Sequence, residues 1–285
     1  MVNTLVITSY RDDLVQGKIG NGVEELLGQK VDVAEFGEIE FLLGNAVEML
    51  WQGKSLTSYN KIIMYGGVTR LLRIAHPLAV ALQGLGVDVF TSSAENYRGV
   101  DKLTQYVQMS LAGFSIPKTY FANAENLLKH AETQIGFPMI VKDILNSRGE
   151  NNFLIKNQSE LDRLKDKLTE DRYVAKKYIE NDGDIRVLMN DQGDHFAYKR
   201  TATDGSHLNN IAQGAEVMEY TPSKELVDEC ARLLTCMNLH LGGIDVIVTS
   251  DAHYFLEANV QPVVFHGEFA KAKQRVVANL LTRAQ

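Results

Sequence analysis

The chain of 285 residues carries 29 Lys and Arg against 36 Asp and Glu, a net charge of −7, and 45% of its residues are hydrophobic. This is the composition of a globular protein with room for more than one core. No basic run interleaved with aromatic residues occurs, which argues against nucleic acid as a partner. No window approaches the ~18 apolar residues of a membrane span, and the start MVNTLVITSY lacks the basic residues of a signal peptide, so we expect a cytoplasmic protein without a membrane partner.

Short β-rich runs alternate with helical segments at the start of the chain. The expected strands are 5–9, 31–36, 62–67 and 87–92, and the expected helices are the segment containing GVEELLGQ and residues 71–85. Strands that alternate with helices favour βαβ units and a parallel sheet. We therefore expect an α/β domain over residues 1–97.

Three glycines after the first strand, Gly17, Gly20 and Gly22, suggest a dinucleotide-binding turn. Their order is G-x-x-G-x-G, however, whereas the fingerprint is G-x-G-x-x-G, so we expect a flexible loop here. The chain contains no G-x-x-x-x-G-K-[ST] motif, which excludes a P-loop enzyme.

The next predicted element is a helix over residues 102–112. Its hydrophobic residues Leu103, Val107 and Leu111 recur at the spacing of one buried helix face. A glycine and a proline, Gly113 and Pro117, are expected to end it.

From residue 138 onward the pattern changes to β-rich runs separated by turns, which favours antiparallel α+β structure. The runs are PMIVKDI, NNFLIK, YVAKKYI, DIRVLMN and HFAYKRTA. A helix is expected over 225–237, with Thr221 as N-cap and Pro222 at the first helical position. Cys230 and Cys236 lie six residues apart in this helix and point to different faces, so we expect both to be reduced.

The segment GGIDVIVTSDAHYFLEANVQP (242–262) predicts a hairpin with strands 244–248 and 254–258. If Val248 faces Tyr254, then Asp245 lies opposite Glu257, and Asn259 shares their face. Two carboxylates and an amide oxygen suit Mg²⁺, which takes hard oxygen ligands and completes its shell with water and phosphate. A solvent-exposed hairpin with polar outward positions is the alternative.

Two upstream segments add charge to this pattern. VKDILNSRGENNFLIK (141–156) predicts two strands around a polar loop that contains Gly149. Lys142 would project toward the loop, whose amides could cover phosphates, although a plain hairpin turn has the same pattern. In the segment GDIRVLM, Asp184 and Arg186 are spaced to share one strand face.

Together these segments resemble the ATP-grasp superfamily, and within it the RimK-type branch of carboxylate–amine ligases. The resemblance covers about residues 62–262, in the order expected for the family. The matching text is DKLTQYVQMSLAGFSIPKT, VKDILNSRGENN, VAKKYI, GDIRVLM, LNNIAQGA, GGIDVIV and FLEANVQP. It implies an N-terminal α/β domain (1–97) and a two-subdomain ATP-grasp module of α+β structure (98–174 and 175–285).

The resemblance also implies site residues, one position at a time. The nucleotide-contacting positions are Lys102, Lys142, Ser147, Gly149, the hinge Lys177, Tyr178 and Ile179, and Asp184. The metal positions are Asp245, Glu257 and Asn259, in agreement with the hairpin argument. The positions that line the reaction centre are Arg186, Arg200 and Asn210, for each of which a structural or surface role is the alternative.

The chain departs from the family pattern at several positions. The hinge glutamate is replaced by Lys177, and the second loop glycine by Asn151, a residue that tolerates left-handed geometry. An arginine of the branch is replaced by Leu208, which removes one positive charge near the triphosphate. We expect Lys199 or Arg200 to supply it.

The implied function is ATP-dependent ligation of a carboxylate to an amine through an acyl phosphate, with ADP and phosphate released. ATP and Mg²⁺ (with Mn²⁺ as the alternative ion) are the implied cofactors, and an amino acid or a peptide or protein carboxylate, with an amine, the implied substrates. Self-association is left open. Two other functions remain: a non-catalytic ATP-binding regulator, favoured by Leu208 and the altered hinge, and a ligase that modifies peptide side chains.

Overall fold

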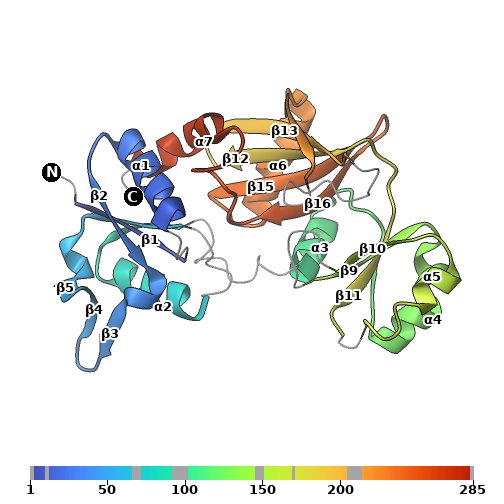
Figure 1. The fold of residues 1–285 in the computed structure, drawn as a ribbon, viewed down its shortest axis with the longest axis horizontal. Helices are drawn as coiled ribbons and strands as arrows, with labels where there is room; N and C mark the ends of the chain where they lie inside the picture. The colour runs from blue at the N-terminus through green and yellow to red at the C-terminus, as the bar shows by residue number, and fades with distance from the viewer. Residues whose placement is uncertain are drawn as a thin grey trace.

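The computed structural model of the chain describes residues 3–9, 13–65, 72–91, 102–144, 151–168, 171–203 and 214–282. Within these residues the strands form four sheets, and the helices pack on them (Figure 1). The mixed α/β and α+β class that the sequence predicts is confirmed.

The N-terminal sheet has the order β2-β1-β6-β7 and all its pairs are parallel, as predicted. Its strands are β1 (Thr4–Thr8), β2 (Val31–Glu35), β6 (Lys61–Met64) and β7 (Asp88–Thr91), and its helices are α1 (Asp13–Leu27) and α2 (Leu72–Gly84). A small antiparallel sheet lies between β2 and β6 in the chain. It contains β3 (Glu40–Leu43), β4 (Val47–Trp51) and β5 (Lys54–Ser55), flanked by the 3-10 turns η1 (Phe36–Glu38) and η2 (Leu56–Ser58).

The three N-terminal glycines lie inside α1, so the expectation of a flexible loop is wrong. A Cβ at Gly20 would lie 2.9 Å from Val33 Cγ2, and one at Gly22 would lie 2.5 Å from Phe265 Cδ1. Gly20 and Gly22 are therefore contact points where the helix approaches its neighbours closely, a requirement that the local sequence does not reveal.

The central sheet has the order β10-β9-β11-β8, with antiparallel pairs. Its strands are β8 (Thr119–Phe121), β9 (Met139–Asp143), β10 (Asn152–Ile155) and β11 (Tyr173–Lys177), and α4 (Ala124–Ile135) and α5 (Gln158–Asp162) pack on one face of it. The expected division of the module after residue 174 runs through β11. Asn151, next to β10, has φ +52°, the left-handed geometry expected of it.

Helix α3 (Lys102–Leu111) lies where predicted, but the predicted buried face is wrong. Val107 and Leu111 are exposed, and the buried residues are instead Gln105, Tyr106 and Met109. Gln105 explains the orientation, since its side chain donates to the carbonyl of Ala258 (3.0 Å) and accepts from the amide of Ala258 (2.9 Å). This long-range pairing fixes the rotation of the helix. At the end of α3, Gly113 has φ +74°, which agrees with the predicted stop.

The C-terminal sheet has the order β14-β13-β12-β15-β16 and is antiparallel. Its strands are β12 (Asp184–Asn190), β13 (His195–Thr201), β14 (Glu216–Tyr220), β15 (Leu241–Val248) and β16 (His253–Asn259), and its helices are α6 (Lys224–Cys236) and α7 (Ala270–Thr282). The N-cap of α6 is Ser223, which accepts from the amide of Leu226, so the prediction of Thr221 is wrong by two residues. Cys230 is buried and Cys236 exposed, and both are free, as expected.

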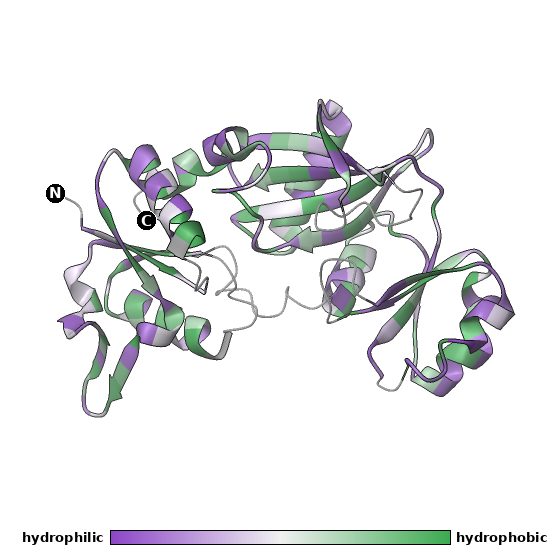
Figure 2. Ribbon diagram, in the orientation of Figure 1, coloured by the Kyte–Doolittle hydropathy of each residue, from purple (hydrophilic) through white to green (hydrophobic). Residues whose placement is uncertain are grey.

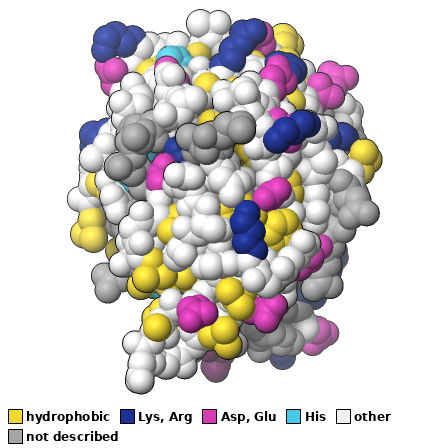
Figure 3. All heavy atoms as spheres, turned by 90° about the vertical axis from the view of Figure 1, so that its left-hand side faces the viewer, with side chains coloured by type: hydrophobic (Ala, Val, Ile, Leu, Met, Phe, Trp, Pro, Cys, Tyr) yellow, Lys and Arg dark blue, Asp and Glu magenta, His cyan; other side chains and the backbone are white. Residues whose placement is uncertain are grey.

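Each sheet contributes apolar residues to the buried clusters, and one cluster joins the N-terminal sheet to α7 and the C-terminal sheet. Figure 2 shows green segments along the strands of the C-terminal sheet and mixed purple and green on α4 and α5, which cover the central sheet from one side. The end of the molecule in Figure 3 shows Lys, Arg, Asp and Glu side chains of both signs interspersed.

No helix of the described ranges is long and apolar enough to cross a membrane.

Candidate active site

The β15–β16 hairpin brings Asp245 opposite Glu257, as the sequence predicts, but by a different route. Val248 pairs with His253, not Tyr254, so the loop is one residue shorter than expected. The register then shifts between Asp245 and Val246, because Leu256 is an extra residue in β16. This bulge restores the pairing of the two carboxylate residues.

The Asp245 carboxylate is held by two arginines. Arg186 donates to it in bidentate fashion, with Nε–Oδ1 and Nη2–Oδ2 distances of 2.6 Å each, and Arg200 Nη2 lies 3.0 Å from Oδ2. Strand pairing creates the first contact, since Arg186 lies opposite Asp245 across β12 and β15. Burial alone would raise the pKa of Asp245, but the two guanidinium groups outweigh it and lower the pKa to about 2.

Asp184 completes this charge cluster. It lies opposite Arg200 across β12 and β13 and accepts from Arg200 Nε at 2.6 Å. Burial raises the pKa of Asp184 to about 6, with Asp245 adding to the effect and Arg200 opposing it. The guanidinium group of Arg200 therefore bridges two buried carboxylates and contacts both.

A second group of charges, all lysines, approaches from α3 and the central sheet. Lys102 Nζ lies 3.9 Å from Glu257 Oε2, which joins the start of α3 to β16. Lys142 on β9 has its ammonium 5.5 Å from the ring centroid of Tyr106, and Lys176 on β11 lies 4.0 Å from the same centroid. Burial lowers the pKa of each lysine, and Glu257 acts in the opposite direction.

The expected hinge begins at Lys177, the last residue of β11. The amide of Lys177 donates to Lys118 O (2.8 Å) and that of Tyr178 to Pro138 O (3.3 Å), while the carbonyl of Ile179 accepts from Asn181 Nδ2 (2.8 Å). The Lys177 ammonium lies 3.5 Å from Phe137 O. The segment is thus tied to the central sheet at its first two residues.

The third expected metal ligand, Asn259, lies beside the carboxylates. Its side-chain nitrogen donates to Gly243 O (3.2 Å) and to Asp245 Oδ2 (3.4 Å). Ser147, Gly149 and Asn210 lie outside the described residues, so the structure does not place them.

The oxygens of Asp245, Glu257 and Asn259 fit a hard divalent cation by their chemistry. Among the residues that the structure places, no three His, Cys, Asp or Glu side chains are grouped to hold a metal. A cation here would therefore rely on two carboxylates and an amide, with water and phosphate completing its shell. Both oxygens of Asp245 also serve the arginines, so a cation would share this carboxylate with them.

Two residues in this region, Tyr106 and Lys176, were missed by sequence reasoning. Tyr106 follows Lys102 by four positions on α3, which puts the two side chains on one helix face. Lys176 shares a sheet face with Lys142, because Lys142 pairs with Val174, two residues before Lys176. The spacing of Tyr106 from Lys102 can be read from the sequence alone. The shared face of Lys176 and Lys142 can be recognised only once the strand register is known.

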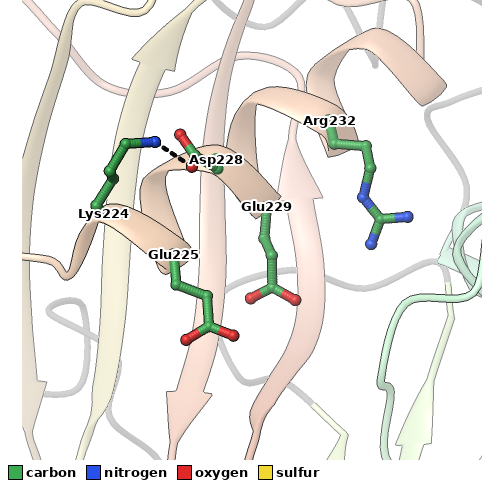
Figure 4. Close-up of a pocket in the computed structure, with 5 residues that line it drawn as sticks. All are labelled: Lys224, Glu225, Asp228, Glu229 and Arg232. Atoms are coloured by element: carbon green, nitrogen blue, oxygen red, sulfur yellow. Dashed lines mark hydrogen bonds and ion pairs between the residues drawn. The ribbon is translucent and has the colours of Figure 1, made fainter.

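A separate surface depression of about 430 Å³ lies on α6 (Figure 4). It is lined by Lys224, Glu225, Asp228, Glu229 and Arg232. All five belong to one helix, and Lys224 pairs with Asp228 at 2.5 Å. It shares no lining residue with the charge clusters described above.

A family model described as a RimK-like ATP-grasp domain matches residues 99–276, more than half of the chain. The probable alpha-L-glutamate ligase of Cellvibrio japonicus (strain Ueda107) is 25% identical over 249 residues, which cover 82% of this chain and 80% of that protein.

Two solved structures share the fold over nearly all of their length. The ATP-grasp ligase PsnB, complexed with a phosphomimetic variant of its minimal precursor, Mg and ADP, has a TM-score of 0.74 at 14% identity, covering 99% of this chain and 98% of that chain. The macrocyclase MdnC from Microcystis aeruginosa MRC, bound with precursor peptide MdnA, has a TM-score of 0.73 at 16% identity, covering 99% and 100%. The chain therefore belongs to the RimK-like ATP-grasp family and is an ATP-dependent carbon–nitrogen ligase.

Proposed function

We propose that this ligase activates a peptide or protein carboxylate as an acyl phosphate and joins it to the amine of an amino acid, with glutamate as the first candidate. The observation that carries the proposal is the convergence of lysines from α3 and β9 on the carboxylates of β15 and β16. Glutamate comes from the name of the Cellvibrio japonicus relative, and peptide substrates from the precursor-bound PsnB and MdnC structures.

In this proposal the triphosphate of ATP lies among Lys102, Lys142 and the hairpin carboxylates, under the loop with Ser147 and Gly149. The ammonium groups of Lys102, Lys142 and Lys176 repel one another, and the carboxylate of Glu257 offsets only part of their charge. The region therefore has a surplus of positive charge. A polyphosphate balances such a surplus. The adenine would lie at the hinge, where the amides of Lys177 and Tyr178 already have partners, which leaves the amide of Ile179 as the donor to the base.

Asp245, Glu257 and Asn259 would hold magnesium, which when bound neutralises charge on the transferring phosphoryl group. Arg186, Arg200 and Asn210 would orient the oxygens of the carboxylate and the acyl phosphate. The bidentate geometry of Arg186 suits a planar carboxylate or a phosphate. Asp184 would act through Arg200, whose guanidinium it holds in place.

The reaction takes two steps. A carboxylate oxygen attacks the γ-phosphorus, a C–O–P linkage forms, and the bond to the β-phosphate oxygen breaks to release ADP. The amine nitrogen then attacks the acyl carbon, the C–N bond forms, phosphate leaves, and the proton lost by the amine goes to solvent. The basic side chains stabilise the charge that develops on the transferring oxygens.

The test uses hydroxylamine as a surrogate amine. The protein is incubated with Mg²⁺, ATP and a panel of amino acids and acidic peptides, and ADP and hydroxamate are measured together. We expect ADP and hydroxamate in equal amounts for at least one acid. AMP and pyrophosphate as products would exclude the acyl phosphate route.

Two other outcomes separate the remaining functions. Tight nucleotide binding without turnover on any carboxylate would favour a regulator. A product in which the new amide joins two side chains of one peptide, without a free amine consumed, would favour a ligase that modifies peptide side chains.

A further inference from the structure

Lys176 is the most deeply buried lysine of the described nucleotide region. It is the fourth residue of β11 and 3% exposed, and its ammonium nitrogen has no hydrogen-bond partner among the described residues. An ammonium group has three donors and no acceptor, so burying it without an acceptor is unfavourable. The ring of Tyr106, 4.0 Å away, offers only a cation–π contact, and the hydroxyl of Tyr106 also lacks a partner.

The surroundings of Lys176 add to this cost. Lys142 shares its sheet face, and the pKa of Lys176 is lowered well below its ordinary value by burial, then by Lys142 and Lys102, against the pull of Glu257. Of the carboxylates that act on the three lysines, Asp245 is held by two arginines and Asp143 pairs with Arg172, which leaves Glu257 to oppose them. A ligand that supplies acceptor oxygens to Lys176 would offset the cost of burying its ammonium group.

Each cation that the sequence suggested as a substitute for the charge missing at Leu208 already pairs with a carboxylate of the chain. Lys199 pairs with Asp182 at 2.7 Å, and Arg200 is held between Asp184 and Asp245. Lys176 lies instead beside the two lysines already assigned to the phosphates. Its three N–H donors have no acceptor among the described residues.

We propose that Lys176 is a third phosphate-contacting lysine of this enzyme, held on the ring of Tyr106 and directed at the nucleotide polyphosphate. The inference rests on the proposed position of ATP. It assigns to Lys176 the positive charge that Leu208 does not provide, and it assigns to Tyr106 the role of a positioning residue.

The experiment compares Lys176→Met, which keeps the length of the side chain, with Lys167→Met. Lys167 lies 5.0 Å from the ring centroid of Phe153 at an exposed position, so it is a lysine–aromatic contact outside the site. For each full-length variant, the melting temperature without nucleotide is measured, together with the affinities for a non-hydrolysable ATP analogue and for adenosine. Lys176→Gln is a second variant in case the methionine variant does not fold.

We expect Lys176→Met to raise the melting temperature without nucleotide, because an unpaired buried charge is removed. We expect the same change to lower the affinity for the ATP analogue about tenfold or more, because a charge-assisted hydrogen bond is lost. Adenosine affinity should be unchanged, and Lys167→Met should change none of the three quantities.

A lower melting temperature with unchanged affinity for the analogue would make Lys176 a structural residue and overturn the proposal. An equal loss for adenosine would place Lys176 at the base and overturn it as well. A wild-type protein that binds no analogue would contradict the proposed nucleotide site itself. If Lys142→Met abolishes binding of the analogue and Lys176→Met does not weaken it, the proposed function stands and this inference fails.

Discussion

At the scale of single residues, the site is organised by charge pairs among its own side chains. Asp245 contacts Arg186 and Arg200, and Arg200 also contacts Asp184. Removing one member of such a buried set leaves a charge without compensation, which is strongly destabilising. The guanidinium groups can therefore turn to ligand oxygens only when the charge of Asp245 is balanced in another way.

Glu257 offers a test of the metal site, because its ion pair with Lys102 is long at 3.9 Å. We expect Glu257→Gln to lower the affinity for a non-hydrolysable ATP analogue at least about tenfold when Mg²⁺ is present. In EDTA the loss of affinity should be much smaller. Calorimetry in the two buffers measures this, with Glu225→Gln on the exposed side of α6 as the control. An equal loss in both buffers would contradict a role in metal binding.

Lys273 on α7 gives a pH-dependent prediction. Burial and the charge of Arg186 lower the pKa of Lys273 to about 8 from 10.5, against the opposing effect of Glu268. Between these values the unfolded chain binds more protons than the folded one, so this residue makes stability rise with pH. Urea unfolding of wild type and Lys273→Met should show the wild type gaining stability relative to the variant from about pH 8 to 10.5. Parallel pH curves would contradict the assignment.

At the scale of elements, alternation and helical periodicity located the strands of the N-terminal sheet, β9 to β13, the β15–β16 hairpin and the helices α2, α3 and α6. They did not predict the short or irregularly patterned elements β3, β4, β5, β8, β14, α4, α5 and α7. They did not predict which side of α3 is buried, because that side is set by the bonds between Gln105 and the backbone of Ala258, 153 positions away. The same holds for the hairpin. The pairing of Asp245 with Glu257 was predicted from a loop of the wrong length, and the bulge at Leu256 compensates for the error.

The site residues could be predicted where the family pattern covers them, and their partners could not. The bidentate contact of Arg186 with Asp245 depends on β12 lying between β13 and β15, an order that local sequence does not encode. Lys176 was missed for the same reason, whereas the spacing of Tyr106 from Lys102 on α3 could be read from the sequence. Their importance comes from α3 and the central sheet meeting near the hairpin.

Helix α1 provides a matched pair of glycines for a test of element packing. A Cβ at Gly22 would lie 2.5 Å from Phe265, whereas one at Gly17 has no atom within 4 Å. Gly22→Ala should lower the free energy of unfolding by about 1–3 kcal/mol, the cost of overpacking. Gly17→Ala should raise it by about 0.5–1 kcal/mol through helix propensity. Denaturant unfolding measures both, and a stabilising effect at Gly22 would contradict the close contact.

At the scale of the whole molecule, the two ends of the chain share a core. Residues of β1, α1 and β6 pack with Phe265 and with residues of α7, and the ammonium of Lys61 donates to Leu281 O at 2.8 Å. Figure 1 shows α7 beside α1, between the N-terminal and C-terminal sheets. The C-terminal sheet, which carries the acidic part of the site, is thereby anchored to the N-terminal domain.

Tyr65 is the clearest link between these parts. Its hydroxyl donates to Pro262 O (3.0 Å) and accepts from the amide of Val264 (2.7 Å). Tyr65→Phe keeps the edge-on ring contact with Phe265 but leaves two buried backbone groups without a partner, so we expect a loss of about 1–3 kcal/mol. Urea unfolding checks this, and unchanged stability would show that the link is weak.

The acyl phosphate is the central chemical claim, and transfer of ¹⁸O tests it most directly. The carboxylate substrate found in the hydroxamate screen is labelled with ¹⁸O, and the phosphate released in one turnover is analysed by mass spectrometry. Because a carboxylate oxygen bonds to the γ-phosphorus and leaves with it, we predict one ¹⁸O atom in each phosphate released. Unlabelled phosphate, or ¹⁸O recovered in AMP, would contradict the account.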